Sequence, residues 1–206
     1  LSYEKDIEPL LNQTVLLPPR SWQQELALGQ RYAAVKVAAS KLGINRILYR
    51  PQKDEIVPLG LIASGAAHAY LAHALADMEL TGRIPILKLG LSYPIDEQIV
   101  TAFASHCRQV VVIEERRSFV ERQVLQILMP LKQAGRLTTE VYGKEFPKPH
   151  RGIPAVRGLN PSILIERLVP LIREHSSLPI ELTNGRLSAE LESISQTANY
   201  EVDIPD

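Results

Sequence analysis

The sequence predicts a three-layer α/β protein in which helices cover both faces of a mainly parallel sheet. Short, almost uniformly apolar runs, typical of strands buried on both faces, alternate with longer segments of helical composition. Between residues 59 and 135, strand, loop and helix repeat in the manner of consecutive crossover units. Because such crossovers are right-handed, we expect the loops after residues 64, 90 and 115 to lie along one edge of the sheet.

The first 57 residues are expected to form a linker, a helix and a strand that pack on the main domain. Two prolines after an apolar run (LLPPR) indicate a turn into a helix over residues 21–42. Ser21 is its predicted N-cap, with Gln24 as the capping-box partner, and Gly43 ends it. The segments NRILYR and EIVPLGLIAS flank PQKD and predict a strand, a turn and a second strand.

The main domain is predicted over residues 58–175 and a C-terminal tail over residues 176–206. Its strands are predicted at residues 59–64, 84–90, 109–115 and 137–143, and its helices at residues 66–80, 96–107, 118–135 and 160–175. Asp96 and Asn160 are the predicted N-caps of two of these helices, and Pro161 occupies a first helical position. Pro130 is expected either to kink or to split the third helix. The tail contains one further helical stretch, GRLSAELESISQTA.

The composition excludes several classes of protein. The 206 residues are 45% apolar and 22% charged, as in a globular protein that can bury a sizeable core. The 23 basic and 23 acidic residues cancel, so the chain lacks the basic excess of a surface that binds nucleic acid or anionic membranes.

The single cysteine, Cys107, sets a second limit. It cannot form an internal disulfide or supply the ligand set of an iron–sulfur cluster, and it favours a reduced, cytoplasmic setting. No apolar run approaches the roughly 18 residues of a membrane span, and the N-terminus lacks the pattern of a signal peptide. The chain does not begin with Met, as expected of a segment cut from a longer protein.

Most motifs that suggest chemistry have a simpler structural explanation. The segment GLIASGAA lacks the Lys-Ser/Thr of a phosphate loop, so Gly65 is expected to permit a sharp turn between strand and helix. His68 and His73 are five residues apart, whereas metal ligands on one helix face are three or four apart. His106 and Cys107 are neighbours on a helix and point to different sides, which predicts a buried thiol. No G-x-S-x-G or comparable nucleophile motif is present.

Two charged segments remain open to interpretation. The carboxylates of Glu114 and Glu115, in EERR after the third strand, have the chemistry of acid/base or positioning groups. Salt-bridged and capping charges at a helix start explain them better. The basic loop GKEFPKPHRG either contacts an anion or crosses another domain in contact with solvent, and the sequence does not decide between the two.

The chain resembles the large (alpha) subunit of indolepyruvate ferredoxin oxidoreductase. The resemblance runs from Val15 to His175 and is carried by VLLPPRSW, LGLIASGAAHAYLAHAL, ILKLGLSYPIDEQIVTAFASHCRQVVVIEERRSFVERQV and VYGK. The LKLG-x-x-YP loop and the V-V-V-x-E-E…F-x-E strand–helix step are its most specific parts. The family uses thiamine diphosphate to decarboxylate aryl pyruvates oxidatively to aryl-acetyl coenzyme A, and it passes the electrons through iron–sulfur clusters to ferredoxin.

The resemblance implies a middle domain similar to the C-terminal domain of transketolase, lying between two thiamine-binding domains and chiefly architectural. The chain has no G-D-G followed by Asn and no cysteine-rich segment. We therefore expect no catalytic residue, metal ligand or cofactor in this segment, and no activity in isolation. Thiamine diphosphate with magnesium and the iron–sulfur clusters would belong to the parent enzyme. The implied partners are its other domains, its smaller subunit, ferredoxin and coenzyme A, with a homodimer as a further form.

The loops at the predicted sheet edge supply the candidate interface residues, which are Gly65, Tyr93, Pro94, Glu114 and Glu115. Two alternatives stay open. One is a non-enzymatic module of the same fold, which docks a partner or a small anionic ligand at this edge. The other is the same enzyme class acting on pyruvate or another 2-oxoacid.

Overall fold

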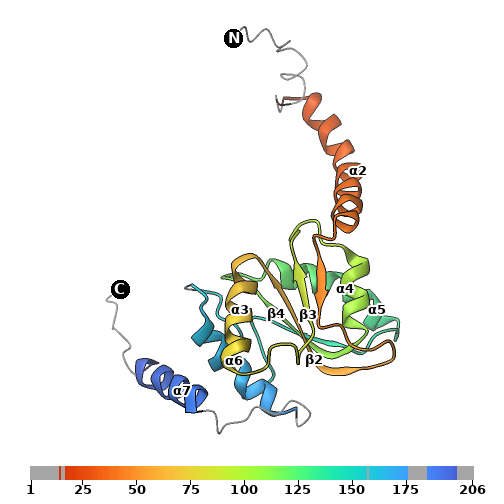
Figure 1. Cartoon of the computed structure of the whole chain (residues 1–206). Coiled ribbons are helices and arrows are strands. Elements are labelled where there is room, and N and C mark those ends of the chain that lie inside the picture. Colours follow the sequence, from red (N-terminus) through yellow and green to blue (C-terminus); the bar gives the residue numbers. More distant parts are fainter. Residues whose placement is uncertain (1–13, 15–16, 157, 176–184, 199–206) are drawn as a thin grey trace. The chain divides into compact units, whose positions relative to one another are not determined.

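The chain divides into two compact units, Leu1–Gly43 and Ile44–Asp206. The computed structural model describes residue 14 and residues 17–156, 158–175 and 185–198 (Figure 1). The predicted tail is described only over residues 185–198, and most of the N-terminal linker lies outside the described residues. No helix in these described ranges combines the length and the apolar character needed to cross a bilayer.

The first unit contains one long helix, α2 (Arg20–Lys41). It confirms the helix predicted over residues 21–42, but the predicted cap is wrong. Pro19 occupies the N-cap position, and no side chain caps the helix. Ser21 is the second residue of the helix, and its own backbone N–H already donates to the carbonyl of Leu17. Gly43 follows the helix with φ +59°, the left-handed conformation expected of a terminating glycine.

The second unit is built on a five-stranded sheet of order β1-β3-β2-β4-β5. Its strands are β1 (Arg46–Leu48), β2 (Val57–Ser64), β3 (Ile86–Leu89), β4 (Cys107–Ile113) and β5 (Glu140–Tyr142). Three neighbouring pairs are parallel, and β1 alone runs antiparallel, against β3. The predicted strands on either side of PQKD exist, but they do not pair with each other, because β3 lies between them in the sheet.

Helices cover both faces of this sheet, which confirms the predicted α/β fold (Figure 1). The core of one face contains residues of α3 (Gly65–Asp77) and α6 (Pro161–Arg173), and that of the other contains residues of α4 (Glu97–Ala104) and α5 (Val120–Gln133). Side chains of β2 and β4 alternate between these cores: Leu61 and Val111 belong to the first, and Ile62 and Val112 to the second. Both faces of the sheet are therefore shielded from solvent, which explains why the strands are uniformly apolar.

The two helix N-caps predicted in this unit, Asp96 and Asn160, are both present. The carboxylate of Asp96 accepts the N–H of Gln98 at 2.9 Å, and the amide oxygen of Asn160 accepts the N–H of Ile163 at 2.9 Å. Pro130 lies inside α5 and does not split it. The last helix, α7 (Gly185–Ala198), covers the stretch predicted in the tail and buries Leu187 in the core that contains α3 and α6.

Candidate functional site

The loops that follow β2, β3 and β4 enclose a shallow cavity of about 310 Å³. It is lined by residues 64–67 after β2, by Ser92 after β3 and by five residues between 114 and 120 after β4. All three strands are parallel, so these loops lie at one edge of the sheet, as predicted. The cavity brings together three of the five predicted interface residues, Gly65, Glu114 and Glu115.

The position of the cavity follows from the topology. The chain leaves β2 toward α3 on one face of the sheet, and it leaves the adjacent β4 toward α5 on the opposite face. Two neighbouring parallel strands whose connections diverge in this way leave a crevice between them, where open α/β sheets commonly bind ligands. The edge is thus the natural place for a site in this fold.

Gly65 begins α3 beside this cavity with φ +53°, a conformation that favours glycine. A Cβ atom at this position would meet nothing within 4 Å. Glycine is therefore favoured here by the backbone angle and not by lack of space. Ser64 is the N-cap of α3, but its side chain makes no capping hydrogen bond. Gly65 therefore serves the sharp turn that the sequence predicted.

Glu114 holds the start of α5. Its side chain is 6% exposed, and one carboxylate oxygen, Oε2, accepts the backbone N–H groups of Phe119 at 3.0 Å and Val120 at 2.7 Å. The other oxygen, Oε1, accepts the N–H of Glu121 at 3.1 Å. The carboxylate thus satisfies three N–H groups at the helix start, where negative charge is also favoured by the helix dipole. This geometry agrees with the capping interpretation, whereas Glu115 and Arg117 are exposed at the cavity.

Lys144 joins the loop after β5 to this edge, a contact that sequence reasoning missed. Its Nζ donates to the backbone carbonyls of Glu114 at 2.7 Å and Pro154 at 3.3 Å. Its backbone N–H donates to Oε2 of Glu121 at 3.1 Å. Burial lowers the pKa of Lys144 and raises that of Glu121, although the carboxylates of Glu114 and Glu121 partly offset the fall for Lys144. This lysine of the basic loop therefore binds the protein itself rather than an external anion.

The loop after β3 starts at Gly90, where two backbone N–H groups are held by one side chain. The amide oxygen of Asn45 accepts the N–H of Gly90 at 3.0 Å and that of Leu91 at 3.1 Å. A Cβ atom on Gly90 would collide with the side chain of Ile44 and would lie 2.7 Å from its carbonyl oxygen. Strand β3 therefore ends at a position where the backbone passes so close to Ile44 that only glycine fits.

An aromatic pair lies next to the cavity. The rings of Tyr93 and Phe119 have centroids 6.1 Å apart, and both side chains are about half exposed. The amide nitrogen of Gln123 donates to the carbonyls of Ser92 at 3.0 Å and Phe119 at 3.2 Å, which ties the two segments together. Pro94 follows Tyr93 through a cis peptide bond and is partly buried. The predicted interface role of this loop stays a prediction.

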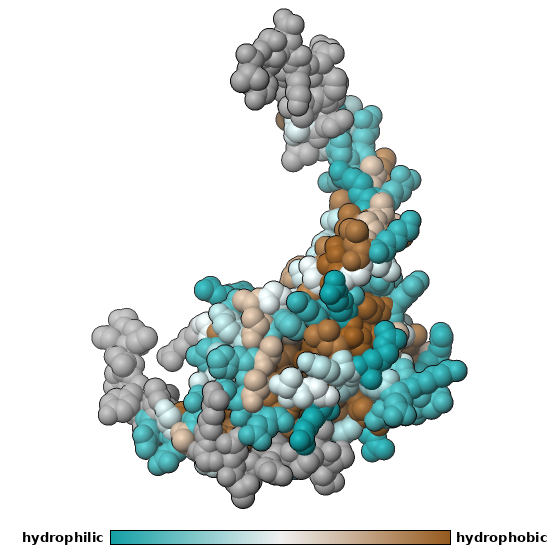
Figure 2. Space-filling view, viewed as in Figure 1, coloured by the Kyte–Doolittle hydropathy of each residue, from teal (hydrophilic) through white to brown (hydrophobic). Residues whose placement is uncertain are grey.

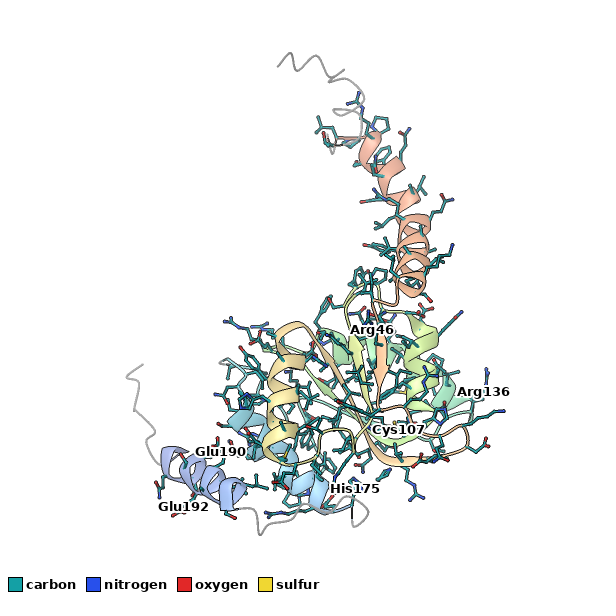
Figure 3. The ribbon with its side chains drawn as sticks, viewed as in Figure 1. Arg46, Cys107, Arg136, His175, Glu190 and Glu192 are labelled. Atoms are coloured by element: carbon teal, nitrogen blue, oxygen red, sulfur yellow. The ribbon has the colours of Figure 1, made fainter. Side chains whose placement is uncertain are left out.

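Three other groups singled out in the sequence, Cys107, His73 and His68, do not line this cavity. Cys107, labelled in Figure 3, is buried. Burial raises the pKa of its thiol to about 12, and the thiol lies 3.4 Å from the carbonyl oxygen of Phe103. His73 pairs with Asp77, four residues on, at 3.1 Å. Burial lowers the pKa of His68, and Lys88 adds to this effect. The prediction of a buried thiol is confirmed, but its placement on a helix is wrong, because α4 ends at Ala104 and Cys107 begins β4.

The carboxylate of Glu114 is not free to bind a metal ion. Both of its oxygens accept backbone N–H groups, whereas a magnesium ion requires oxygen ligands directed at it. In the part of the chain that the structure describes, no three His, Cys, Asp or Glu side chains are placed to hold a metal ion.

Comparison with known proteins gives one consistent family. The profile of the indolepyruvate oxidoreductase domain matches residues 50–197. Two proteins named indolepyruvate oxidoreductase subunit IorA, from Methanothermobacter thermautotrophicus and Methanothermobacter marburgensis, are each 34% identical over 110 and 115 residues. These alignments cover 53% and 56% of this chain but only 16% and 18% of the relatives, so the chain spans a small part of their length.

A search of solved structures gives a more distant likeness. A 2-oxoglutarate:ferredoxin oxidoreductase from Magnetococcus marinus, with 2-oxoglutarate, coenzyme A and succinyl-CoA bound, matches 66% of this chain and 20% of its own. The TM-score is 0.39 and the sequence identity 14%.

Proposed function

We propose that this chain, which belongs to the indolepyruvate oxidoreductase domain family, is an architectural domain of the large subunit of a 2-oxoacid:ferredoxin oxidoreductase. The family match extends from just before β2 to α7 and thus includes all the helices that cover the sheet. The proposed reaction of the parent enzyme is the oxidation of indolepyruvate or another aryl pyruvate. The products are aryl-acetyl coenzyme A and carbon dioxide, and ferredoxin receives the electron pair.

One observation carries the architectural role: the charged groups closest to the sheet edge are used to build the fold. Glu114 accepts three backbone N–H groups, and Lys144 donates to two backbone carbonyls. A general acid or base needs a lone pair or proton directed at the substrate, whereas these groups direct theirs at the backbone. The chemistry would then be supplied by other parts of a longer chain.

The cofactors and partners of this proposal belong to that longer assembly. Thiamine diphosphate with magnesium would supply the carbon–carbon bond cleavage, iron–sulfur clusters would carry the electrons, and coenzyme A would accept the acyl group. The smaller subunit and the other domains would contact this domain. The exposed Tyr93–Phe119 pair, with Gly65, Pro94 and Glu115 beside it, is the proposed contact surface, since half-exposed aromatic residues are enriched in protein interfaces. A cytoplasmic location stays a prediction.

The test compares the 206-residue chain with the complete enzyme. We would express the full reading frame that contains this segment, together with its smaller subunit, and follow reduction of a viologen dye by indolepyruvate in the presence of coenzyme A. We expect turnover by the assembly and none by the 206-residue chain. Turnover by that chain alone would overturn the architectural role. An assembly that oxidises pyruvate but no aryl pyruvate would refute the substrate and keep the enzyme class.

The cavity at the sheet edge supports a second candidate, a domain that binds a small ligand there. Its volume of about 310 Å³ and its position between diverging connections are those of ligand crevices in α/β sheets. Calorimetric titration of the 206-residue chain with coenzyme A and with nucleotides separates the candidates. Tight, saturable binding that is lost in an Ala66→Trp variant, which fills the cavity, would favour the binding module.

A further inference from the structure

Helix α6 carries one arginine whose charge is poorly compensated. Only 11% of the Arg167 side chain is exposed, and its Nε is shielded from solvent with no hydrogen-bond partner among the described residues. In the same part of the chain it has one ion-pair partner, Oε1 of Glu166, at 3.5 Å from Nη2. A guanidinium has five N–H groups and cannot lose its charge. The surface of the α/β unit carries many hydrophilic side chains, teal in Figure 2, so burial and not charge sets Arg167 apart.

A second guanidinium comes from the loop between β5 and α6. Arg151 is exposed, and it lies close enough to Arg167 for its charge to act on the pKa of that residue. Burial is the main cause that lowers the pKa of Arg167; Glu166 opposes the fall, and Arg151 adds to it. Within the described ranges the Arg151 side chain makes no ion pair or hydrogen bond. Two positive charges thus lie near each other with one adjacent carboxylate.

The backbone that carries Arg151 is held in place by its neighbours. The N–H of Ile153 donates to the carbonyl of Gly143 at 2.8 Å. Gly152 lies so close to the backbone of Lys144 that an added Cβ would collide with the carbonyl group there. The two residues after Arg151 are therefore fixed against the start of the same loop. A ligand that binds this guanidinium has less chain to order, which favours binding.

A further carboxylate on this side of α6 already has a partner. Glu174 follows Arg167 by about two helical turns and lies on the same side of the helix. Its Oε1 lies 2.7 Å from Nε2 of His150, the residue directly before Arg151. This contact ties the loop to the helix beside the two arginines. It also leaves the guanidinium groups with more N–H donors than the surrounding fold supplies acceptors.

We infer that Arg151 and Arg167 form a binding site for a small oxyanion of the phosphate type, between the loop after β5 and α6. Such an anion offers several acceptor oxygens, and the planar N–H fork of arginine matches them in pairs. Its negative charge compensates both guanidinium groups. The basic loop then has two roles, because Lys144 binds the protein and Arg151 binds the anion. Neither arginine lines the cavity at the sheet edge, and the inference does not depend on the proposed enzyme.

The test is a titration of the 206-residue chain with inorganic phosphate at constant ionic strength, followed by calorimetry and by the arginine Nε–H signals in proton–nitrogen NMR spectra. We expect saturable binding and a shift of the Arg167 Nε–H signal, which Arg167→Lys identifies by removing it. Arg151→Gln should raise the dissociation constant about tenfold, the effect of losing one charge-assisted hydrogen bond. Arg173→Gln on α6 and Lys148→Gln in the loop remove the same charge from exposed positions and should change it less than about twofold.

The outcomes separate a specific site from general attraction between charges. The absence of a saturable shift, or equal weakening by Arg151→Gln and Arg173→Gln, would overturn the inference. Because Arg151 is exposed, its variant stays decisive if Arg167→Lys does not fold. Glycerol phosphate distinguishes two sources of the anion: weaker binding than that of inorganic phosphate assigns the free ion, and equal or tighter binding assigns a phosphate group of a larger ligand. Acetate that binds as tightly as phosphate would refute the phosphate assignment in favour of a carboxylate.

Discussion

Replacement of Glu114 should destabilise the α/β unit far more than replacement of its neighbour Glu115. The two glutamates are adjacent in sequence and identical in chemistry, but their environments differ. Glu114 is buried and accepts three backbone N–H groups at distances of 3.0, 2.7 and 3.1 Å. Glu115 is exposed beside the cavity. The comparison therefore isolates the capping role from the general effect of removing a negative charge.

The magnitude follows from the hydrogen bonds that are lost. Each buried N–H left without an acceptor costs about 1–3 kcal/mol, and loss of an ordinary N-cap costs about 1 kcal/mol. Water that enters from the cavity can satisfy part of the three N–H groups, so we expect Glu114→Ala to lower the free energy of unfolding by about 3 kcal/mol. Glu114→Gln keeps one acceptor oxygen but turns an NH₂ group toward donors, which should cost about 2 kcal/mol. Glu115→Gln should stay within about 0.5 kcal/mol of the wild type.

Urea unfolding followed by far-UV circular dichroism is the suitable assay, because the single tryptophan, Trp22, lies on α2 and not in the α/β unit. The transition midpoint should fall while the urea dependence of the free energy stays constant. If Glu114→Gln and Glu115→Gln unfold at the same urea concentration, the carboxylate does not hold α5, and the architectural argument loses its main support.

Three further predictions concern other parts of the same unit. Gly90→Ala should lower the free energy of unfolding in urea by about 1–3 kcal/mol, because the added Cβ collides with Ile44. Gly158→Ala, with open space around the added carbon, should leave it nearly unchanged. Equal losses of stability in the two variants would contradict the steric explanation. The thiol of Cys107, with a pKa of about 12, should resist iodoacetamide at pH 8 in the native state and react once urea unfolds the chain; rapid native alkylation would show that it is accessible. Burial in the folded state raises the pKa of Glu121 above 4.5, so ionisation of this carboxyl group opposes folding. The stability that the raised pKa contributes is complete below pH 4.5 and is lost as the pH rises through the raised pKa. Glu121→Gln should therefore change stability relative to the wild type by an amount that depends on pH between 7 and 4.5, and a constant difference in urea midpoint over this range would refute the assignment.

The sequence was sufficient for those features that depend on neighbouring residues. Asp96 and Asn160 cap their helices as predicted, because the acceptor and the N–H it binds are two or three positions apart. The parallel sheet was predictable because uniform apolar runs separated by helices have few other solutions. The predicted Ser21 cap was wrong by two residues, since Pro19 occupies the N-cap position and the helix that starts at Arg20 already includes Ser21.

Contacts between residues far apart in the chain could not be predicted from the sequence. Lys144 binds the carbonyl of Glu114 across 30 positions, and Asn45 holds Gly90 across 45. Nothing in either local sequence marks these pairs, because a lysine in a basic loop and an asparagine after a helix are equally compatible with solvent. The steric need for glycine at position 90 likewise arises only when the Ile44 backbone is placed beside it.

These distant contacts bear directly on what the sheet edge can do. Parallel strands with diverging connections leave a crevice at their ends, and many enzymes place catalytic groups there. In this chain two ionisable groups at the edge, Glu114 and Lys144, instead fix the loops against one another. The groups left facing outward are the aromatic rings of Tyr93 and Phe119 and the exposed charges of Glu115 and Arg117. An edge that presents aromatic rings and charges to the outside has the composition of a protein interface, which agrees with the proposed architectural role.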